Sequence, residues 1–443
     1  MRRPANRQSV LALVVVLGAA GFAPWLGAQA PPPQPLPTTI TGQPLTAPNV
    51  QPASGTVGVP TAPIQRFQDF RTLPPETVQA IYGMRASADW LWRMNQPNGR
   101  FLSGLNPALK QALPDDPDFR QAVATLALCR AARFTGDEKF APRAAQAVLT
   151  LLSLTRPDPA NPGVREPIAP SERCNRVGFA AVLALAIAEI PNPDAKLIAD
   201  AEALTLFVRN HCAADGSVQA FDSPTDPAKS DPNATTLYPG LALQSLVVSV
   251  RRKPDPATQA AIARGITFYR TAYKSQPNPM LAATMLPAIT DYYLLTKDAN
   301  TAAAGLELAD GLCACQYTRA DATQIAWIGG FRPSAGTLNV EPRYETAAFV
   351  EGLAAATTLT RHAPDLTRFE KYRAACVGGL LFAKSLQFTE DNTEHFEKAY
   401  RSRFIVGGVH LSPTEASVRA DVTGLMVLAC VRYLESGAEV RAE

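Results

Sequence analysis

The chain has 443 residues, of which 47% are hydrophobic and 18% are charged, and its formal net charge is +3. This composition is enough for a large buried core and excludes an intrinsically disordered protein. The basic residues are scattered, and their one cluster, Arg251-Arg252-Lys253, falls where a helix is expected to end, a position that favours cations. The charge pattern therefore argues against a nucleic-acid partner.

The first 30 residues have the build of an export signal. Three arginines among the first seven residues precede an apolar run at 10–21, and Ala28-Gln29-Ala30 offers small residues for cleavage. We therefore expect an exported protein, which is periplasmic, on the cell surface or secreted. Membrane contact is expected only if the signal is retained as an anchor through residues 8–27.

A proline-rich linker is expected at residues 31–65, because residues 31–63 contain ten prolines and no charged residue. Such a segment is a semi-rigid spacer and not a domain. The folded body is predicted to span residues 66–437, followed by a short tail at 438–443.

Hydrophobic periodicity predicts twelve helices of two alternating kinds. One kind is long and amphipathic: 77–96, 139–155, 194–211, 256–275, 299–316 and 367–388. The other kind is apolar nearly all round and rich in Ala and Gly: 118–134, 175–190, 238–252, 279–296, 343–361 and 417–435. A helix without a polar face is buried on every side, so the second set is expected to form an inner ring within an outer ring. The sequence thus predicts an all-α (α/α)6 toroid of six helical hairpins.

Helix-capping signals support several of these boundaries. Asp116-Pro117, Asn192-Pro193 and Asp255-Pro256 each place a capping side chain before a proline at the first helical position. Ser412-Pro413-Thr414-Glu415 is a capping box, which moves the expected start of the last inner helix to near Pro413.

The connections between helices differ in length. Segments from an inner helix to the next outer helix have only a few residues, whereas most of the return segments are long: 97–117, 156–174, 212–237, 317–342 and 389–416. The long loops are therefore expected on one face, beside the N-termini of the inner helices. Such a face of a rigid scaffold is where binding and catalysis usually occur.

A repeated segment near the C-terminus supports the hairpin array. Gly329-Gly330-Phe331 is followed by Arg343-Tyr344-Glu345 and an inner helix, and Gly407-Gly408-Val409 is followed by Arg419-Ala420-Asp421 and another. Each glycine pair also follows an outer helix that ends in Gln. The two segments that contain Arg and an acid are therefore expected at the same end of the barrel.

The ends of the outer helices resemble the QW repeat of squalene-hopene cyclases and their relatives in the terpenoid cyclase and protein prenyltransferase superfamily. Arg85-Ala86, Trp90-Leu91, Gln96 and Gly99-Arg100-Phe101 fit this repeat with one extra residue before the Gln. Degenerate copies are Phe207-Val208, Cys212 and Gly216-Ser217-Val218, and Phe382-Ala383, Gln387 and Gly407-Gly408-Val409. The resemblance implies an (α/α)6 toroid over residues 66–437.

The chemistry of that superfamily is not supported by the residues. Cyclases of this kind use an Asp-x-Asp-Asp acid, and the prenyltransferases hold zinc with Asp-x-Cys and a later His, but the chain has neither motif. Cys313-Ala314-Cys315 is expected within a helix, where residues two apart point in different directions. We therefore expect no metal and no cofactor. Cys174 and Cys212 lie near helix ends, where an exported protein can form a disulfide, and their pairing stays open.

Polar residues at the starts of the inner helices form the candidate site. Glu345 and Asp421 are a candidate acid and base pair for glycoside hydrolysis or polysaccharide lysis, two activities that α/α toroids often house. The alternative is that each acid pairs with a neighbouring arginine and stabilises a helix N-terminus.

The other members of this polar set are candidates for substrate binding. Arg176, Arg343 and Arg419 are expected to bind an acidic sugar, and Tyr238 and Tyr344 to stack on a sugar or act as a base. Glu172 and Arg173 precede the same inner helix as Arg176.

Two classes of function remain open. The absence of a nucleophile elbow, a P-loop, a His-Glu-x-x-His pair and a dinucleotide fingerprint favours a toroid that binds a glycan or peptide without catalysis. The alternative is a carbohydrate-active enzyme that uses Glu345 and Asp421. A small lipid ligand or a terpenoid cyclase-like activity is less favoured, since aromatic residues make up only 7% of the chain.

Overall fold

The computed structural model describes residues 62–67, 69–114, 117–168, 174–220 and 231–437. The predicted signal, the linker up to residue 61 and the tail at 438–443 lie outside these residues. The 3₁₀ helix η1 (Pro63–Phe67) crosses the predicted linker boundary, and the centroid of the Phe67 ring lies 6.4 Å from that of Phe134. The ordered body therefore includes Pro63. Among the described helices, none is long and apolar enough to cross a membrane.

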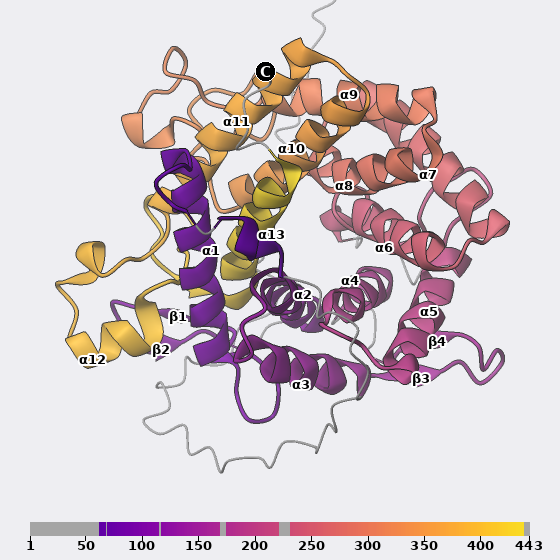
Figure 1. Ribbon diagram of the computed structural model, residues 1–443, viewed down its shortest axis with the longest axis horizontal. Helices are drawn as coiled ribbons and strands as arrows, with labels where there is room; N and C mark the ends of the chain where they lie inside the picture. Colours follow the sequence, from indigo (N-terminus) through magenta and orange to yellow (C-terminus); the bar gives the residue numbers. More distant parts are fainter. Residues whose placement is uncertain (1–61, 68, 115–116, 169–173, 221–230, 438–443) are drawn as a thin grey trace, which may run out of the picture.

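Twelve of the described helices form two concentric rings (Figure 1). The inner ring consists of α2 (Asp118–Thr135), α4 (Arg176–Glu189), α6 (Tyr238–Arg252), α8 (Pro279–Thr296), α10 (Glu345–His362) and α13 (Ala420–Ser436). The outer ring consists of α1 (Pro75–Met94), α3 (Phe140–Leu152), α5 (Ala195–Asn210), α7 (Pro256–Ser275), α9 (Ala299–Cys313) and α11 (Leu366–Ser385). Each inner helix packs against two inner neighbours, and α13 packs against α2, which closes the ring. The predicted (α/α)6 toroid is confirmed.

The inner helices approach one another closely because small residues lie at their contacts. A Cβ added to Gly240 of α6 would lie 2.3 Å from the backbone of Thr284 in α8, and one added to Gly352 of α10 would lie 2.7 Å from the carbonyl oxygen of Ala283. These separations are too short for any side chain, so glycine is required for this helix spacing.

The predicted capping residue is correct for α7 but not for α5. The Asp255 carboxylate accepts a hydrogen bond from the Thr258 amide at 3.0 Å, as a capping residue should. Asn192 does not cap α5, because it adopts a left-handed backbone with φ 52°. Asp194 caps this helix instead, through the Leu197 amide at 2.7 Å. The predicted cap Asp116 lies outside the described residues.

The prediction that the capping box at Ser412 begins the last inner helix is also wrong. The Ser412 hydroxyl accepts a hydrogen bond from the Glu415 amide at 3.2 Å, so the box forms a turn, yet α13 begins only at Ala420. The short strand β5 (Val418–Arg419) intervenes and pairs antiparallel with β1 (Gly104–Asn106), which also pairs with β2 (Gln111–Ala112). Strand pairing holds the backbone of Arg419 extended and so delays the helix.

Four outer helices end in the same structural unit, which we call a clasp. In each clasp a residue after the helix forms an isolated antiparallel bridge with the apolar residue of the glycine segment: Asn95 with Phe101, Cys212 with Val218, Gln316 with Phe331, and Gln387 with Val409. The clasp glycines have positive φ and pack against the next outer helix: Gly99, Gly216, Gly329 and Gly407. Asn95, and not the predicted Gln96, therefore fills the Gln position of the repeat, which removes the extra residue.

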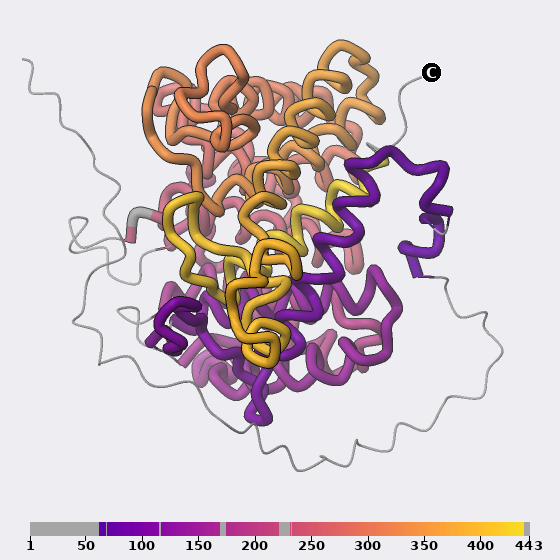
Figure 2. Tube along the Cα trace, turned by 90° about the vertical axis from the view of Figure 1, so that its left-hand side faces the viewer, coloured from indigo at the N-terminus to yellow at the C-terminus, as the bar shows by residue number. Residues whose placement is uncertain are grey.

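The clasp after α11 joins the end of the chain to its beginning. Gln387 Nε2 donates hydrogen bonds to the Gly83 carbonyl at 2.9 Å and to Ser87 Oγ at 2.8 Å, both on α1. The Ser87 hydroxyl in turn donates to the Gly407 carbonyl at 3.1 Å. Figures 1 and 2 show the consequence, with indigo α1 lying beside yellow α13.

We expect Gly407→Ala to lower the free energy of unfolding by about 2–4 kcal/mol, because φ at this residue is 92° and the new Cβ would lie 2.2 Å from the Ala86 carbonyl oxygen. Gly336→Ala is the matched control, since a Cβ there meets no atom within 4 Å. Urea unfolding of both variants measures the effect. Equal midpoints for the two variants would contradict the role of the clasp.

A network of ion pairs links the inner helices toward the C-terminal ends of α2, α4 and α13. Arg130, whose side chain is 5% exposed, bonds Glu189 at 3.1 Å and Glu351 at 2.6 Å, which joins α2 to α4 and α10. Arg133 pairs with Glu189 and with Glu435, and Arg432 lies 3.5 Å from Asp291. Charged side chains therefore lie among the inner helices at the end opposite the long loops as well as at the end beside them.

Candidate active site

The predicted acids lie where two neighbouring inner helices begin. Glu345 is the first residue of α10 and Asp421 is the second residue of α13. Tyr344 immediately precedes α10, and Arg419 precedes α13. All four residues therefore lie at the N-terminal end of the inner ring, which we call the mouth.

Asp421 is held by two arginines. Arg419 donates from Nε to Oδ1 at 3.0 Å and from Nη2 to Oδ2, so the pair is bidentate. Arg120 of α2 approaches the same carboxylate, with its Nε 3.9 Å from Oδ2. Only 11% of the Asp421 side chain is exposed. Asp421 is therefore paired with a neighbouring arginine, which the sequence analysis gave as the alternative to a catalytic role.

Arg120 was not assigned to the site in the sequence analysis, although the position of this residue carries a signal. It lies in the first turn of α2, where the helix dipole disfavours a cation, so an acidic partner was to be expected. Asp421 is such a partner, and it comes from the far end of the chain. A closed ring places its first and last inner helices in contact, but hydrophobic periodicity does not show which of their side chains meet there.

Glu345 differs from Asp421 in its electrostatic surroundings. Burial raises its pKa above the ordinary value, and a backbone amide, the Arg343 and Arg419 guanidinium groups and a hydrogen bond with Tyr344 act in the opposite direction without cancelling it. Among the described residues Glu345 forms no salt bridge. Enzymes often give two carboxyl groups different surroundings, so that one with a raised pKa serves as the acid and the other, ion-paired, serves as the base.

Tyr344 lies between these two groups. The Arg419 guanidinium carbon is 5.5 Å from the centroid of its ring, a cation–π contact. Burial and the neighbouring Glu345 raise the pKa of Tyr344, so its hydroxyl is a proton donor and not a base at neutral pH. We refer to Arg120, Tyr344, Glu345, Arg419 and Asp421 as the mouth cluster.

Tyr238 begins α6 but does not present an open ring. It is 2% exposed, and its ring packs edge-on against Phe119 at 5.1 Å between centroids and directly against Gly178. Its hydroxyl donates a hydrogen bond of 2.5 Å to Asp231. Burial and this carboxylate raise the pKa of Tyr238, which does not favour its predicted roles in stacking or as a base.

Arg176 and Arg343 are not brought into the mouth cluster. Arg176 bonds Glu166 at 2.5 Å in the hairpin of β3 (Thr155–Pro157) and β4 (Arg165–Pro167), and it lies over the ring of Phe207 on the outer helix α5. Arg343 pairs with Glu415 at 3.1 Å, and both side chains are more than 40% exposed. Glu172 and Arg173 lie outside the described residues.

The described residues contain no group of three His, Cys, Asp or Glu side chains placed to hold a metal ion. All seven cysteines are free thiols, Cys174 and Cys212 included.

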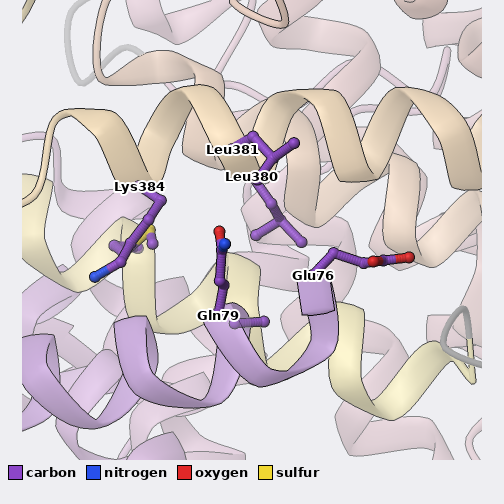
Figure 3. Close-up of a pocket in the computed structure, with 7 residues that line it drawn as sticks. Glu76, Gln79, Leu380, Leu381 and Lys384 are labelled. Atoms are coloured by element: carbon purple, nitrogen blue, oxygen red, sulfur yellow. The ribbon is translucent and has the colours of Figure 1, made fainter. Parts of the chain in front are cut away.

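A small cavity lies elsewhere, between α1 and α11. Its volume is about 10 Å³, room for about one water molecule. Figure 3 shows Lys384 and Leu380 of α11 facing Gln79 and Glu76 of α1 around it. It belongs to the seam where the ring closes and is too small for a substrate.

No family profile and no curated protein sequence matches this chain. The fold, however, matches solved α/α toroids that act on carbohydrates. Unsaturated glucuronyl hydrolase from Bacillus sp. GL1 matches with a TM-score of 0.57 at 14% identity, over 80% of this chain and 96% of that one. Cellobiose 2-epimerase from Bacillus thermoamylovorans matches with a TM-score of 0.57 at 11% identity, over 78% and 95%.

A third match is an inactive variant of an α-1,6-mannanase of Salegentibacter sp., solved with α-1,6-mannotriose. Its TM-score is 0.52 at 11% identity, and the match covers 82% of this chain and 99% of that one. At these identities the comparisons establish the fold class alone. The resemblance to terpenoid cyclases thus holds for the toroid, whereas the matched structures are carbohydrate-active enzymes.

Glu345→Gln is expected to stabilise the protein at pH 7, by about 0.5–2 kcal/mol. The reason is that a carboxyl whose pKa is raised by folding costs nothing below its unfolded pKa and destabilises increasingly as the pH rises above it. Thermal unfolding at pH 7 and pH 4 measures the effect, which should vanish at the lower pH. If Glu345 instead served only to stabilise the start of α10, the variant would be less stable at pH 7.

Proposed function

We propose that this protein is a carbohydrate-active enzyme, a glycoside hydrolase or a polysaccharide lyase, whose active site is the mouth cluster. The observation that carries the proposal is the unequal setting of the two carboxyls, with Glu345 raised in pKa and Asp421 paired with arginines. The fold of carbohydrate-active enzymes supports the same reading.

Glu345 is the proposed general acid. Burial raises the pKa of Glu345, and a carboxyl that keeps its proton to higher pH can protonate the glycosidic oxygen as the bond to the leaving sugar breaks. The Tyr344 hydroxyl acts to lower the pKa of this carboxyl, against the effect of burial, and is proposed to orient it. The positive charge of Arg419, next to both groups, limits how far the pKa rises.

Asp421 is the proposed partner carboxylate. Arg419 and Arg120 fix its orientation, and the carboxylate can activate a water or stabilise positive charge that develops on the sugar ring. In a lyase, the same carboxylate would take the proton next to the sugar carboxyl group. In both cases the two arginines act as positioning residues for the Asp421 carboxylate.

The substrate is proposed to be a polysaccharide outside the cytoplasm, since residues 1–30 have the build of an export signal and residues 31–65 that of a spacer. Retention of the signal would tether the enzyme to a membrane and leave the toroid free to reach its substrate.

The second candidate function is glycan binding without turnover. It is favoured by the bidentate pairing of Asp421, which is also what a purely structural aspartate would show. The mouth cluster would then recognise sugar hydroxyls through its carboxyl and guanidinium groups.

Enzymatic turnover and binding without turnover can be distinguished with the purified 62–437 body. It is incubated with neutral and acidic polysaccharides. Mannan, xylan, pectin, alginate and glycosaminoglycans form a suitable panel. New reducing ends indicate hydrolysis, new unsaturated ends indicate lysis, and binding without either product favours the second candidate. The enzymatic proposal fails if no polysaccharide of the panel is cleaved.

A further inference from the structure

One pair of neighbouring outer helices, α7 and α9, has no long connection beside it. Five of the six connections from an outer to an inner helix are long, but α7 and α8 are joined by residues 276–278 alone. The clasps between outer helices are formed by residues of the long connections. The short connection therefore leaves no segment to form a clasp between α7 and α9.

A groove lies between α7 and α9. Its volume is about 440 Å³, within the range of ligand pockets. The part of α7 along it, from Ala263 to Lys274, is roughly 16 Å long at the rise of an α-helix. The groove is floored by buried apolar and aromatic side chains and walled by exposed polar ones: Ile266, Tyr292 and Ala304 below, and Thr267, Thr271 and Asn300 at the sides.

The groove is preformed and its ends are fixed. At one end the Tyr273 ring packs directly against Gly311, which brings α7 and α9 together. Arg270 and Lys274 both pair with Glu307, at 2.5 and 3.3 Å, and Asp298 also lines the groove, so its two cations are matched by two carboxylates. The floor is held in place because the Tyr292 hydroxyl donates to the Gln259 carbonyl at 3.2 Å.

The walls offer acceptors for hydrogen bonds. The hydroxyls of Thr267 and Thr271 donate to the backbone carbonyls of Ala263 and Thr267, each at 3.0 Å. Each hydroxyl oxygen keeps lone pairs that can accept hydrogen bonds, and the Asn300 amide adds both a donor and an acceptor. Aliphatic and aromatic surface below uncharged polar groups complements a sugar ring, which has an apolar face and a rim of hydroxyls.

We propose that the groove between α7 and α9 is a second glycan site, which binds a short neutral oligosaccharide segment outside the ring. A neutral ligand fits because both cations are already paired, and a sugar fits better than an apolar peptide because the walls carry hydroxyl and amide groups. The site is separate from the mouth cluster, and its existence does not depend on turnover there.

Isothermal titration of the 62–437 body with cellotetraose, xylotetraose and α-1,6-mannotetraose tests the proposal. Thr271→Trp fills the groove and is expected to weaken binding of the recognised probe at least about tenfold, and Asn300→Ala about threefold or more. Lys196→Trp on the exposed face of α5 is the matched control and should leave the affinity unchanged within about twofold. Thermal unfolding shows whether each variant is folded. If Thr271→Trp is unfolded, the affinity of Asn300→Ala tests the proposal instead.

Three results would overturn the proposal. The first is that none of the three probes binds at millimolar concentration. The second is that binding is retained in both groove variants but lost in Glu345→Gln/Asp421→Asn, which would place the ligand at the mouth. The third is that tetragalacturonate binds at the groove more tightly than every neutral probe. Failure of the polysaccharide panel to show turnover bears on the proposed function alone.

Discussion

Glu345→Gln and Asp421→Asn are each expected to lower kcat on the substrate by roughly 10²–10⁴-fold, the usual contribution of a general acid or base. The Glu345 variant loses a proton donor, because an amide of the same shape cannot protonate a leaving oxygen. The Asp421 variant loses the carboxylate and leaves Arg419 and Arg120 without their shared acid.

The pH profile separates the acid role from a structural one. In the wild type, turnover is expected to fall as the pH rises through the raised pKa of Glu345, since only the protonated carboxyl donates. Glu345→Gln should lose this limb of the profile. Glu138→Gln is the matched control, because Glu138 is an exposed acid in the short connection after the C-terminal end of α2, at the opposite end of the inner ring from the mouth cluster. Turnover that survives both Glu345→Gln and Asp421→Asn would defeat the proposed pair.

Arg130→Met is expected to lower the free energy of unfolding by about 3–5 kcal/mol, because it removes one partner from a buried group of charges. Glu351 loses its bond of 2.6 Å, and Glu189 keeps only Arg133. Arg252→Met is the control, since Arg252 and Glu202 form a pair in which both side chains are 31% exposed, and its loss should cost no more than about 1 kcal/mol. The midpoints of urea unfolding are compared for the two variants. Equal shifts of the midpoint would show that burial of the network adds nothing to the free energy of unfolding.

The same network predicts a dependence on pH. Burial acts to raise the pKa of Glu189, but Arg130 and Arg133 outweigh it and hold the pKa below its ordinary value of 4.5. A lowered pKa contributes stability that is present above the unfolded pKa and is lost as the pH falls through the folded one. The difference between wild type and Arg130→Met should therefore shrink as the pH drops below about 4.5.

The helices could be predicted from the sequence because they depend on local signals. The bounds of α6, α7 and α8 agree with the prediction, since a proline lies in the first turn of each helix, and a capping Asp or Asn precedes it in α7 and α8. Closure of the ring was also predictable, because six helices that are apolar on most of their surface are best buried inside a second layer.

What the sequence did not predict depends on contacts between distant segments. The start of α13 is set by the pairing of Val418 and Arg419 with β1, which is more than 300 residues away, and this pairing overrides a local capping box. Arg120 joins the site only because α2 lies beside α13. Arg176 was assigned to the mouth from its position in the sequence, but its side chain turns outward to Glu166 and the ring of Phe207.

A crystal structure of the Glu345→Gln variant, soaked with the oligosaccharide that the polysaccharide panel identifies, tests the central claim most directly. The account predicts a sugar ring at the mouth, with a glycosidic oxygen within hydrogen-bonding distance of residue 345 and the ring close to the Asp421 carboxylate. A glycan bound only in the groove between α7 and α9, with the mouth empty, would contradict the assignment of the mouth cluster as the active site.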